Sequence, residues 1–430
     1  MNHHILRLAI PNVISNITIP IVGIIDIALV GRLGSSAYIG GVGFGTMVFI
    51  LVYTGLAFLR MGTTGLTAQA YGASDFRESA SVLLRALFLS VLAGVILIAL
   101  QVPIGKLLIT KLNGSEEALG YALEYFNTRI YAAPATLVVF VFIGWFIGMQ
   151  NAKIPMIITF IISISNAILS SIFILVYDMK ISGVALGTVI SQYIGLIFCL
   201  LFYFRKFKRI TYFFKLKSVL NFIAIKRFMS VSRDIFIRSL LLTGSFFLFN
   251  AVSASLGNNV LAINSVMLQF LWFFAHVIDG FSYAGGTLAG RCKGAKNQIL
   301  LNTSVKKSYL FAFYISIGFT VLYMLLTKPL FGILTDNTEV IKMSQNFAPW
   351  VWILPLVSFT AFIYDGIYIG VTATATLRNV MMVIILCLFI PLLFILKHYG
   401  ENHGMWLALI VMLIGRGVGL KLFLKKSLKI

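Results

Sequence analysis

The chain has 430 residues, of which 60% are hydrophobic and only 11% are charged. About a quarter of the residues in a soluble globular protein are charged, so this composition indicates an integral membrane protein and excludes a soluble or singly anchored enzyme. The formal net charge is +21, from 34 Lys and Arg against 13 Asp and Glu. In a membrane protein such an excess first indicates topology, so we expect the lipid bilayer, and no nucleic acid, as the partner of these charges.

Apolar runs long enough to cross a bilayer recur along the whole sequence. A helix of about 20 residues crosses the hydrocarbon core, and runs such as 158–176 are apolar on every side, which favours helices over alternating β-barrel strands. The sequence therefore predicts an all-α protein with twelve transmembrane helices. They lie near residues 5–30, 38–60, 79–105, 122–148, 153–177, 183–204, 231–256, 260–289, 303–328, 345–371, 378–397 and 403–422.

The distribution of Lys and Arg predicts the orientation. Alternate connections carry 23 of these residues on one side and seven on the other, and four more, Arg85, Arg129, Arg238 and Arg416, fall inside predicted helices. Because the richer side faces the cytoplasm, we expect a multi-pass protein of the cytoplasmic membrane with both termini in the cytoplasm.

A basic and aromatic segment divides the predicted helices into two sets of six. We expect an N-terminal lobe at 1–204, a cytoplasmic linker at 205–230 that lies on the inner leaflet, and a C-terminal lobe at 231–430. Specific regulation by lipid is the alternative role for the linker. Three short segments of the first half have weak counterparts in the second. They pair 32–41 with 255–264, 67–73 with 289–295, and 182–187 with 403–408, which predicts two pseudo-symmetric six-helix bundles.

Signatures of catalysis and metal binding are absent from the sequence. It contains no Walker A or HExxH motif, and GFSYA at 280–284 lacks the second glycine of a nucleophile elbow. The three cysteines have no CxxC spacing, and His276 is the only histidine well inside a predicted span. We therefore expect no enzyme, no cofactor and no metal site.

Three acidic residues, Asp26, Asp279 and Asp365, lie well inside predicted spans. Burying a carboxylate is costly, so such residues are functional candidates. Asp26 has no basic residue nearer in the sequence than Arg32, so a local salt bridge does not explain it. We expect it to take up and release a proton or to bind a cation, with a structural hydrogen-bonded group as the alternative.

Glycines and prolines accompany these acids. Asp279 and Asp365 each precede a glycine, so we expect local irregularity in both helices, with freed backbone groups facing a cavity. A functional role and a purely structural role are equally favoured for Asp365. For Asp279, the alternative to a functional role is a structural pair with His276. Pro11 and Pro20 precede Asp26, and a kinked first helix can change its bend when the acid changes charge, although kinks also serve packing.

Several stretches together resemble the multidrug and toxic compound extrusion (MATE) transporters, specifically their DinF-like branch. The likeness covers almost the whole chain in order, in IPNVISNITIPIVGIIDIALVGRLG (10–34), FLRMGTTGLTAQAYGA (58–73), SRDIFIRSLLL (232–242), VIDGFSYA (277–284) and YDGIYIG (364–370). The resemblance implies two six-helix lobes that form a V, and antiport of organic compounds against protons or sodium ions.

The resemblance also implies roles for single residues. Asp26 matches the family's ion-coupled acid, and Asp365 matches the acid of the tenth helix. The substrate-cavity candidates in the first half are Asn166, Ser170, Thr188 and Gln192, and those in the second half are Asp365 and Asp279. Two positions depart from the family, because Gly286 and Ser170 stand where relatives can have acids. Their loss weakens a sodium site built from several carboxylates and concentrates ion coupling on Asp26.

We therefore expect a monomeric secondary antiporter that exports small organic compounds, cationic or amphipathic, in exchange for protons. Sodium coupling is one alternative. A flippase for lipids or lipid-linked oligosaccharides is another, but the few basic residues within spans argue against it. A membrane-embedded enzyme or a scaffold would need a cluster of catalytic groups at one depth, which the sequence does not offer.

Overall fold

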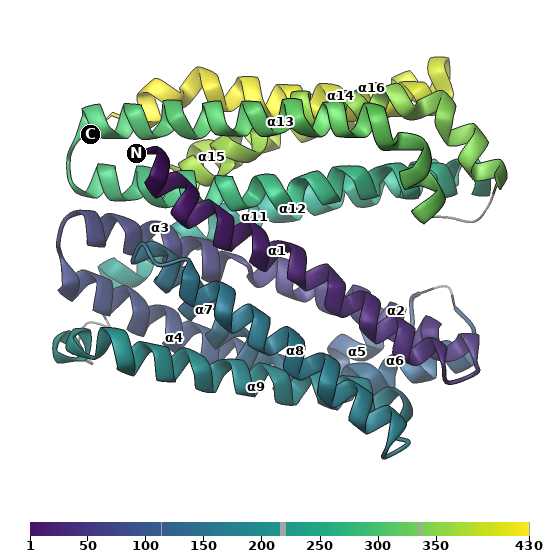
Figure 1. Cartoon of the computed structure of the whole chain (residues 1–430), viewed down its shortest axis with the longest axis horizontal. Coiled ribbons are helices and arrows are strands. Elements are labelled where there is room, and N and C mark those ends of the chain that lie inside the picture. The colour runs from purple at the N-terminus through teal and green to yellow at the C-terminus, as the bar shows by residue number, and fades with distance from the viewer. Residues whose placement is uncertain (113, 216–220, 335–337, 430) are drawn as a thin grey trace. The chain divides into compact units, whose positions relative to one another are not determined.

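The computed structural model describes residues 1–112, 114–215, 221–334 and 338–429. Within these ranges the chain is helical and contains no β-strand (Figure 1). Eleven stretches of the described residues are long and apolar enough to cross a membrane. The all-α membrane architecture predicted from the sequence is therefore confirmed.

The eleventh stretch, 374–427, accounts for the last two predicted helices. Its backbone leaves the helical conformation at Glu401, where φ is 45° and ψ is −123°. A Cβ atom at Gly404 would collide with the carbonyl oxygen of Leu396, so glycine is needed where the chain folds back tightly. The two arms that meet at Glu401 correspond to the spans predicted at 378–397 and 403–422.

The helices of the first half follow the predicted spans but extend beyond most of them. They are α1 (Asn2–Gly31), α2 (Ser36–Leu56), α3 (Phe58–Gly72), α4 (Phe76–Ala99), α5 (Gln101–Ile109), α6 (Glu116–Arg129), η1 (Ile130–Ala132), α7 (Ala133–Gly148), α8 (Lys153–Leu175), α9 (Lys180–Phe207) and η2 (Lys208–Phe213). Ser35, Asp75 and Ser115 accept backbone hydrogen bonds at the starts of α2, α4 and α6, which explains why these helices begin there.

The second half is built from longer helices. They are α11 (Phe222–Ala254), α12 (Asn258–Gly294), α13 (Gln298–Leu334), α14 (Thr338–Gly370), α15 (Thr374–Met382), the π-helical segment η3 (Val383–Phe389) and α16 (Ile390–Ser427). The described chain forms two compact units, one of residues 14–232 and one of residues 1–13 with 233–430. The boundary inside α1 falls between Pro11 and Pro20.

Each unit has its own apolar core. In the unit of residues 14–232, α3 and α4 pack on α7 around the fully buried Trp145, and α2 packs on α6 around Phe126. In the other unit, α12 packs on α13 and α14, and Trp406 of α16 lies in the core. The Trp406 ring nitrogen donates to Asn264 at 2.8 Å, which satisfies the polar atom of this buried side chain.

Glycines allow α12 and α14 to approach until their backbones touch. A Cβ atom at Gly286 would collide with the carbonyl oxygen of Gly366, and one at Gly370 would collide with the carbonyl oxygen of Gly286. Both helices run without a break past Asp279 and Asp365, so the irregularity expected at these positions is wrong. The glycines after the two acids serve helix contact instead. The irregular backbone lies at η3 and Glu401.

The described part of the basic linker packs against its own unit. Ile210 of η2 is buried, and the Phe214 ring stacks on Tyr203 with centroids 6.1 Å apart, while Arg205, Lys206 and the other described basic side chains of 205–215 are exposed. Residues 216–220 of the linker lie outside the described residues.

The contact at Gly286 yields a prediction about stability. We expect Gly286→Ala to lower the free energy of unfolding by about 1–3 kcal/mol, because the added methyl group forces the α12 and α14 backbones apart. Gly318→Ala is the matched control, since a Cβ there meets nothing within 4 Å. Thermal unfolding of both purified variants in detergent measures the difference. An equal midpoint for the two variants would contradict the packing role.

Candidate functional site

Asp26 lies on α1 and faces the pair formed by α8 and α9. Its residue surface is 9% exposed, and its neighbours Asn166, Ser170 and Thr188 are 2%, 0% and 7% exposed. Asn166 and Ser170 lie one turn apart on α8, and Thr188 lies on α9. The structure therefore brings four sequence-predicted candidates together in the unit of residues 14–232.

Asn166 connects the carboxylate of Asp26 to Thr188. With its amide nitrogen turned toward Asp26, Asn166 donates to Oδ1 at 3.3 Å, and its amide oxygen accepts from Thr188 Oγ1 at 3.0 Å. This orientation places each donor opposite an acceptor, as the hydrogen-bond network requires. Ser170 contributes a hydroxyl beside the same carboxyl. The Asp26 carboxylate is thus surrounded by neutral hydrogen-bonding groups.

Gly187 makes this arrangement possible. A Cβ atom at Gly187 would come within 2.8 Å of the Ser170 backbone nitrogen and 2.5 Å of its hydroxyl. The α8 and α9 backbones therefore meet closely at this level, one residue before Thr188. A larger residue at 187 would separate the helices that carry the polar groups around Asp26.

Arg129 also lies near Asp26, a neighbour that the sequence does not predict. It ends α6 and lies within electrostatic range of Asp26, but Asp26 forms no ion pair within the described part of the chain. Its guanidinium donates to the Tyr125 hydroxyl at 2.6 Å and lies 4.7 Å from the centre of the Phe49 ring. Arg129 is thus held by aromatic groups and leaves the carboxylate of Asp26 without a direct cation.

The remaining candidates of α1 and α9 are Gln192, Pro11 and Pro20. Gln192 is half-buried, one turn after Thr188. Pro11 is buried and Pro20 is exposed, and both lie within the uninterrupted helix α1 before Asp26. Because Pro lacks a backbone N–H, each removes a hydrogen bond from the helix and makes it easier to bend.

Asp365 has a different surrounding in the unit of residues 1–13 and 233–430. Its Oδ2 atom accepts from Arg238 of α11 and, at 2.8 Å, from Arg416 of α16. All three side chains are buried. The structure therefore joins two of the intramembrane arginines noted in the sequence to the acid of α14, a pairing that the sequence does not reveal because 127 residues separate Arg238 from Asp365.

Asp279 lies near the same two arginines. It lies within electrostatic range of both Arg238 and Arg416. The ring nitrogen Nδ1 of His276 lies 2.5 Å from the carbonyl oxygen of Trp272, one turn earlier on α12. The cluster thus contains two acids and two arginines, and its formal charges cancel.

The two clusters differ in the kind of charge they can accept. Asp365 is compensated by guanidinium groups of the chain itself, whereas Asp26 is held by neutral donors. Among the described residues, no group of three or more His, Cys, Asp or Glu side chains is arranged to hold a metal ion. Chemically, the Asp26 cluster can exchange a proton or an organic cation without breaking an ion pair within the protein.

Comparison with known proteins agrees with this architecture. The family model described as MatE matches residues 11–172 and again residues 235–396, so the two halves are copies of one unit. The chain is 34% identical to the DNA damage-inducible protein F of Escherichia coli, over 96% of this chain and 90% of that protein. It is 24% identical to the probable multidrug resistance protein NorM of Thermotoga maritima, over 96% and 89% of the two chains.

The fold is also found among solved structures. A MOP superfamily transporter from Pyrococcus furiosus superimposes with a TM-score of 0.88 at 21% identity, over 99% of this chain and 95% of that chain. The double match to the family model spans most of the sequence. The chain therefore belongs to the MatE family of membrane transporters.

Proposed function

We propose that this transporter exports small organic compounds, cationic or amphipathic, in exchange for protons, and that Asp26 carries the proton. One observation supports this most directly. Asp26 is a buried intramembrane carboxylate that bonds to the neutral Asn166 amide and lies beside the Ser170 hydroxyl, with no ion pair in the described chain. A carboxylate of this kind can bind a proton or a cationic ligand, and the two compete for it.

Competition at one carboxylate accounts for exchange. A proton on Asp26 removes the negative charge that attracts an organic cation, and a bound cation disfavours the proton. Protonation also changes the hydrogen bonds between α1 and the α8–α9 pair, and α1 contributes residues to both compact units. We propose that α1 changes its bend near Pro11 and Pro20 when Asp26 is protonated, and so couples the proton to the state of the transporter.

Protons are favoured over sodium ions by the second cluster. Sodium prefers several oxygen ligands, but Asp365 already accepts hydrogen bonds from Arg238 and Arg416. The backbone of α14 lies against Gly286, so there is no space for an additional ion ligand at that position. The guanidinium groups of these two arginines already neutralise the Asp365 carboxylate, so a sodium ion at Asp365 would have to displace one of them.

The names of relatives support small organic compounds as the exported substrates. The distribution of Lys and Arg supports a location in the cytoplasmic membrane. The name of the protein from Thermotoga maritima describes probable multidrug resistance, and that of a Staphylococcus aureus relative describes multidrug export. We propose that the chain works as a monomer in the cytoplasmic membrane with both termini in the cytoplasm. A lipid flippase is less well supported, because Arg238 and Arg416 are engaged by Asp365 rather than free for an anionic headgroup.

The coupling role of Asp26 is tested in proteoliposomes. With an imposed pH gradient, we expect the parent protein to drive transport of ethidium and Asp26→Asn to lose this transport at least tenfold, because the amide cannot exchange a proton. Glu124→Gln is the matched control, since it makes the same acid-to-amide change at an exposed position of α6. Normal pH-driven transport by folded Asp26→Asn, or transport driven by a sodium gradient alone, would contradict the proposal.

The role of Asp365 is tested by separating stability from coupling. We expect Asp365→Asn to lower the free energy of unfolding by about 3–5 kcal/mol, because it leaves two buried guanidinium groups without their common acceptor. Thermal unfolding in detergent measures this loss, and the pH-driven transport per folded molecule should stay close to that of the parent. Unchanged stability together with lost transport would instead identify Asp365 as a coupling residue.

A further inference from the structure

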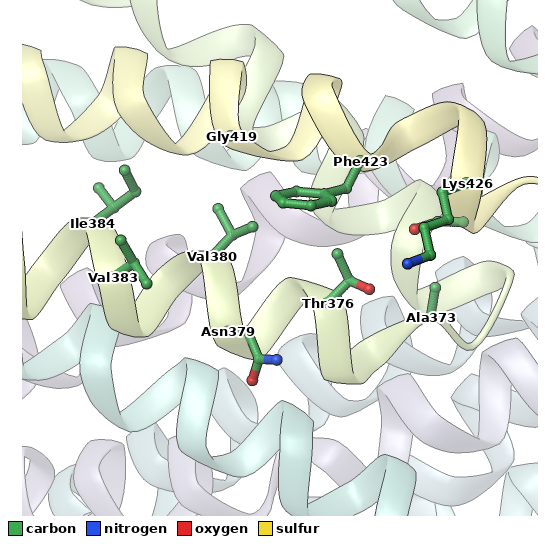
Figure 2. Close-up of a pocket in the computed structure, with 10 residues that line it drawn as sticks. Ala373, Thr376, Asn379, Val380, Val383, Ile384, Gly419, Phe423 and Lys426 are labelled. Atoms are coloured by element: carbon green, nitrogen blue, oxygen red, sulfur yellow. The ribbon is translucent and has the colours of Figure 1, made fainter.

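A groove of about 590 Å³ lies between α15 with η3 on one side and the part of α16 after Glu401 on the other (Figure 2). It belongs to one compact unit and is separate from the Asp365 cluster. Its volume is within the range of small-molecule sites. Its lining residues are Ala373, Thr376, Asn379, Val380, Val383, Ile384, Gly419, Phe423, Lys426 and Ser427.

Glycine contacts and the π-helical segment shape the groove. Gly419 lies so close to Val380 that a Cβ atom there would come within 2.8 Å of the valine side chain. Further along α16, Phe423 and Lys426 line one side of the groove, and Thr376 and Ala373 line the opposite side (Figure 2). The π-helix η3 begins at Val383, and its wider turns change which side chains of the helix face α16.

The lining changes character along the groove. Val380, Val383 and Ile384 form an apolar end, and Phe423 lies between this end and Lys426 (Figure 2). Val383 is 58% exposed and Phe423 is 48% exposed, so apolar surface is left uncovered by the chain. At the other end, Lys426 and Ser427 supply a cation and a hydroxyl. An apolar channel that ends in a cation matches a molecule with an acyl chain and an anionic head.

The charge around the groove is positive. From residue 402 to the C-terminus the sequence has Lys421, Lys425, Lys426 and Lys429 and no acidic residue. Asp234, which accepts a hydrogen bond from Thr374 at the start of α15, is paired with Arg378 at 2.5 Å and Arg233 at 3.4 Å. This acid is therefore neutralised, and the polar end of the groove attracts anions.

We propose that this groove binds an anionic phospholipid, with an acyl chain along Val380, Val383 and Phe423 and the phosphate at Lys426. The site is independent of the proposed export function, because none of its residues belongs to the Asp26 or Asp365 clusters. Basic pockets between membrane helices at the cytoplasmic side are suited to anionic headgroups. A lipid at this position would hold α15 and the end of α16 together.

The experiment counts lipids bound to the purified full-length protein. Native mass spectrometry and thermal unfolding in detergent are recorded with phosphatidylglycerol, with phosphatidylcholine of the same acyl chains, and with inorganic phosphate. We expect phosphatidylglycerol to remain bound and to raise the unfolding midpoint, and the other two to have little effect. Equal binding of phosphatidylcholine, or equal stabilisation by phosphate alone, would overturn the proposal.

Two pairs of neighbouring variants locate the site. Lys426→Gln should weaken phosphatidylglycerol binding about fivefold, as expected for one basic residue at an anionic headgroup, whereas Lys425→Gln, next in the chain but outside the groove, should bind like the parent. Phe423→Ala should weaken binding and Leu422→Ala, which is 74% exposed outside the groove, should not. Equal losses within either pair would contradict binding in the groove and indicate a general surface attraction.

Discussion

A carboxylate inside a membrane-spanning helix must be paired, protonated or held by hydrogen bonds, because the surrounding hydrocarbon cannot solvate its charge. The two halves of this chain meet this requirement differently. Asp365 is paired with Arg238 and Arg416. Asp26 is held by a neutral amide, with a hydroxyl beside it and with Arg129 nearby but not bonded to it. We propose that this difference leaves Asp26 as the group that exchanges its charge during transport.

Close helix contacts at glycines position the helices that carry both clusters. Gly187 brings α8 and α9 together at the level of Ser170, and Gly286 brings α12 and α14 together near Gly366, the residue after Asp365. A Cβ atom at Gly286 would collide with the backbone of α14. In the same unit, Arg238 and Arg416 neutralise Asp365.

The sequence predicts most of the fold because its strongest signal, long apolar runs, is local. The twelve spans, the all-α class and the repeat of one unit all follow from runs and spacings that a single pass along the chain reveals. The positions of Asp26, Asn166 and Thr188 on predicted helices also permit their grouping. What the sequence does not predict depends on contacts between distant residues, such as Arg129 near Asp26 and the pairing of Arg238 with Asp365 across 127 positions.

The wrong expectation has the same origin. Asp279 and Asp365 each precede a glycine, and glycine in a membrane helix permits either a break or a close contact. Only the partner helix decides between the two. Here a Cβ atom at Gly280 would collide with Val13 of α1, and one at Gly366 would collide with the carbonyl oxygen of Ser282. The actual irregularities are η3, which contains no glycine or proline, and Glu401, which directly follows Gly400.

We propose that one carboxylate, Asp26, holds a proton that an organic cation displaces. This proposal is tested most directly by measuring proton release when ethidium is added to purified protein in a weakly buffered detergent solution. We expect about one proton released per bound ethidium in the parent protein and none in Asp26→Asn. Binding without proton release in the parent, or undiminished release from the Asp26→Asn variant, would contradict it.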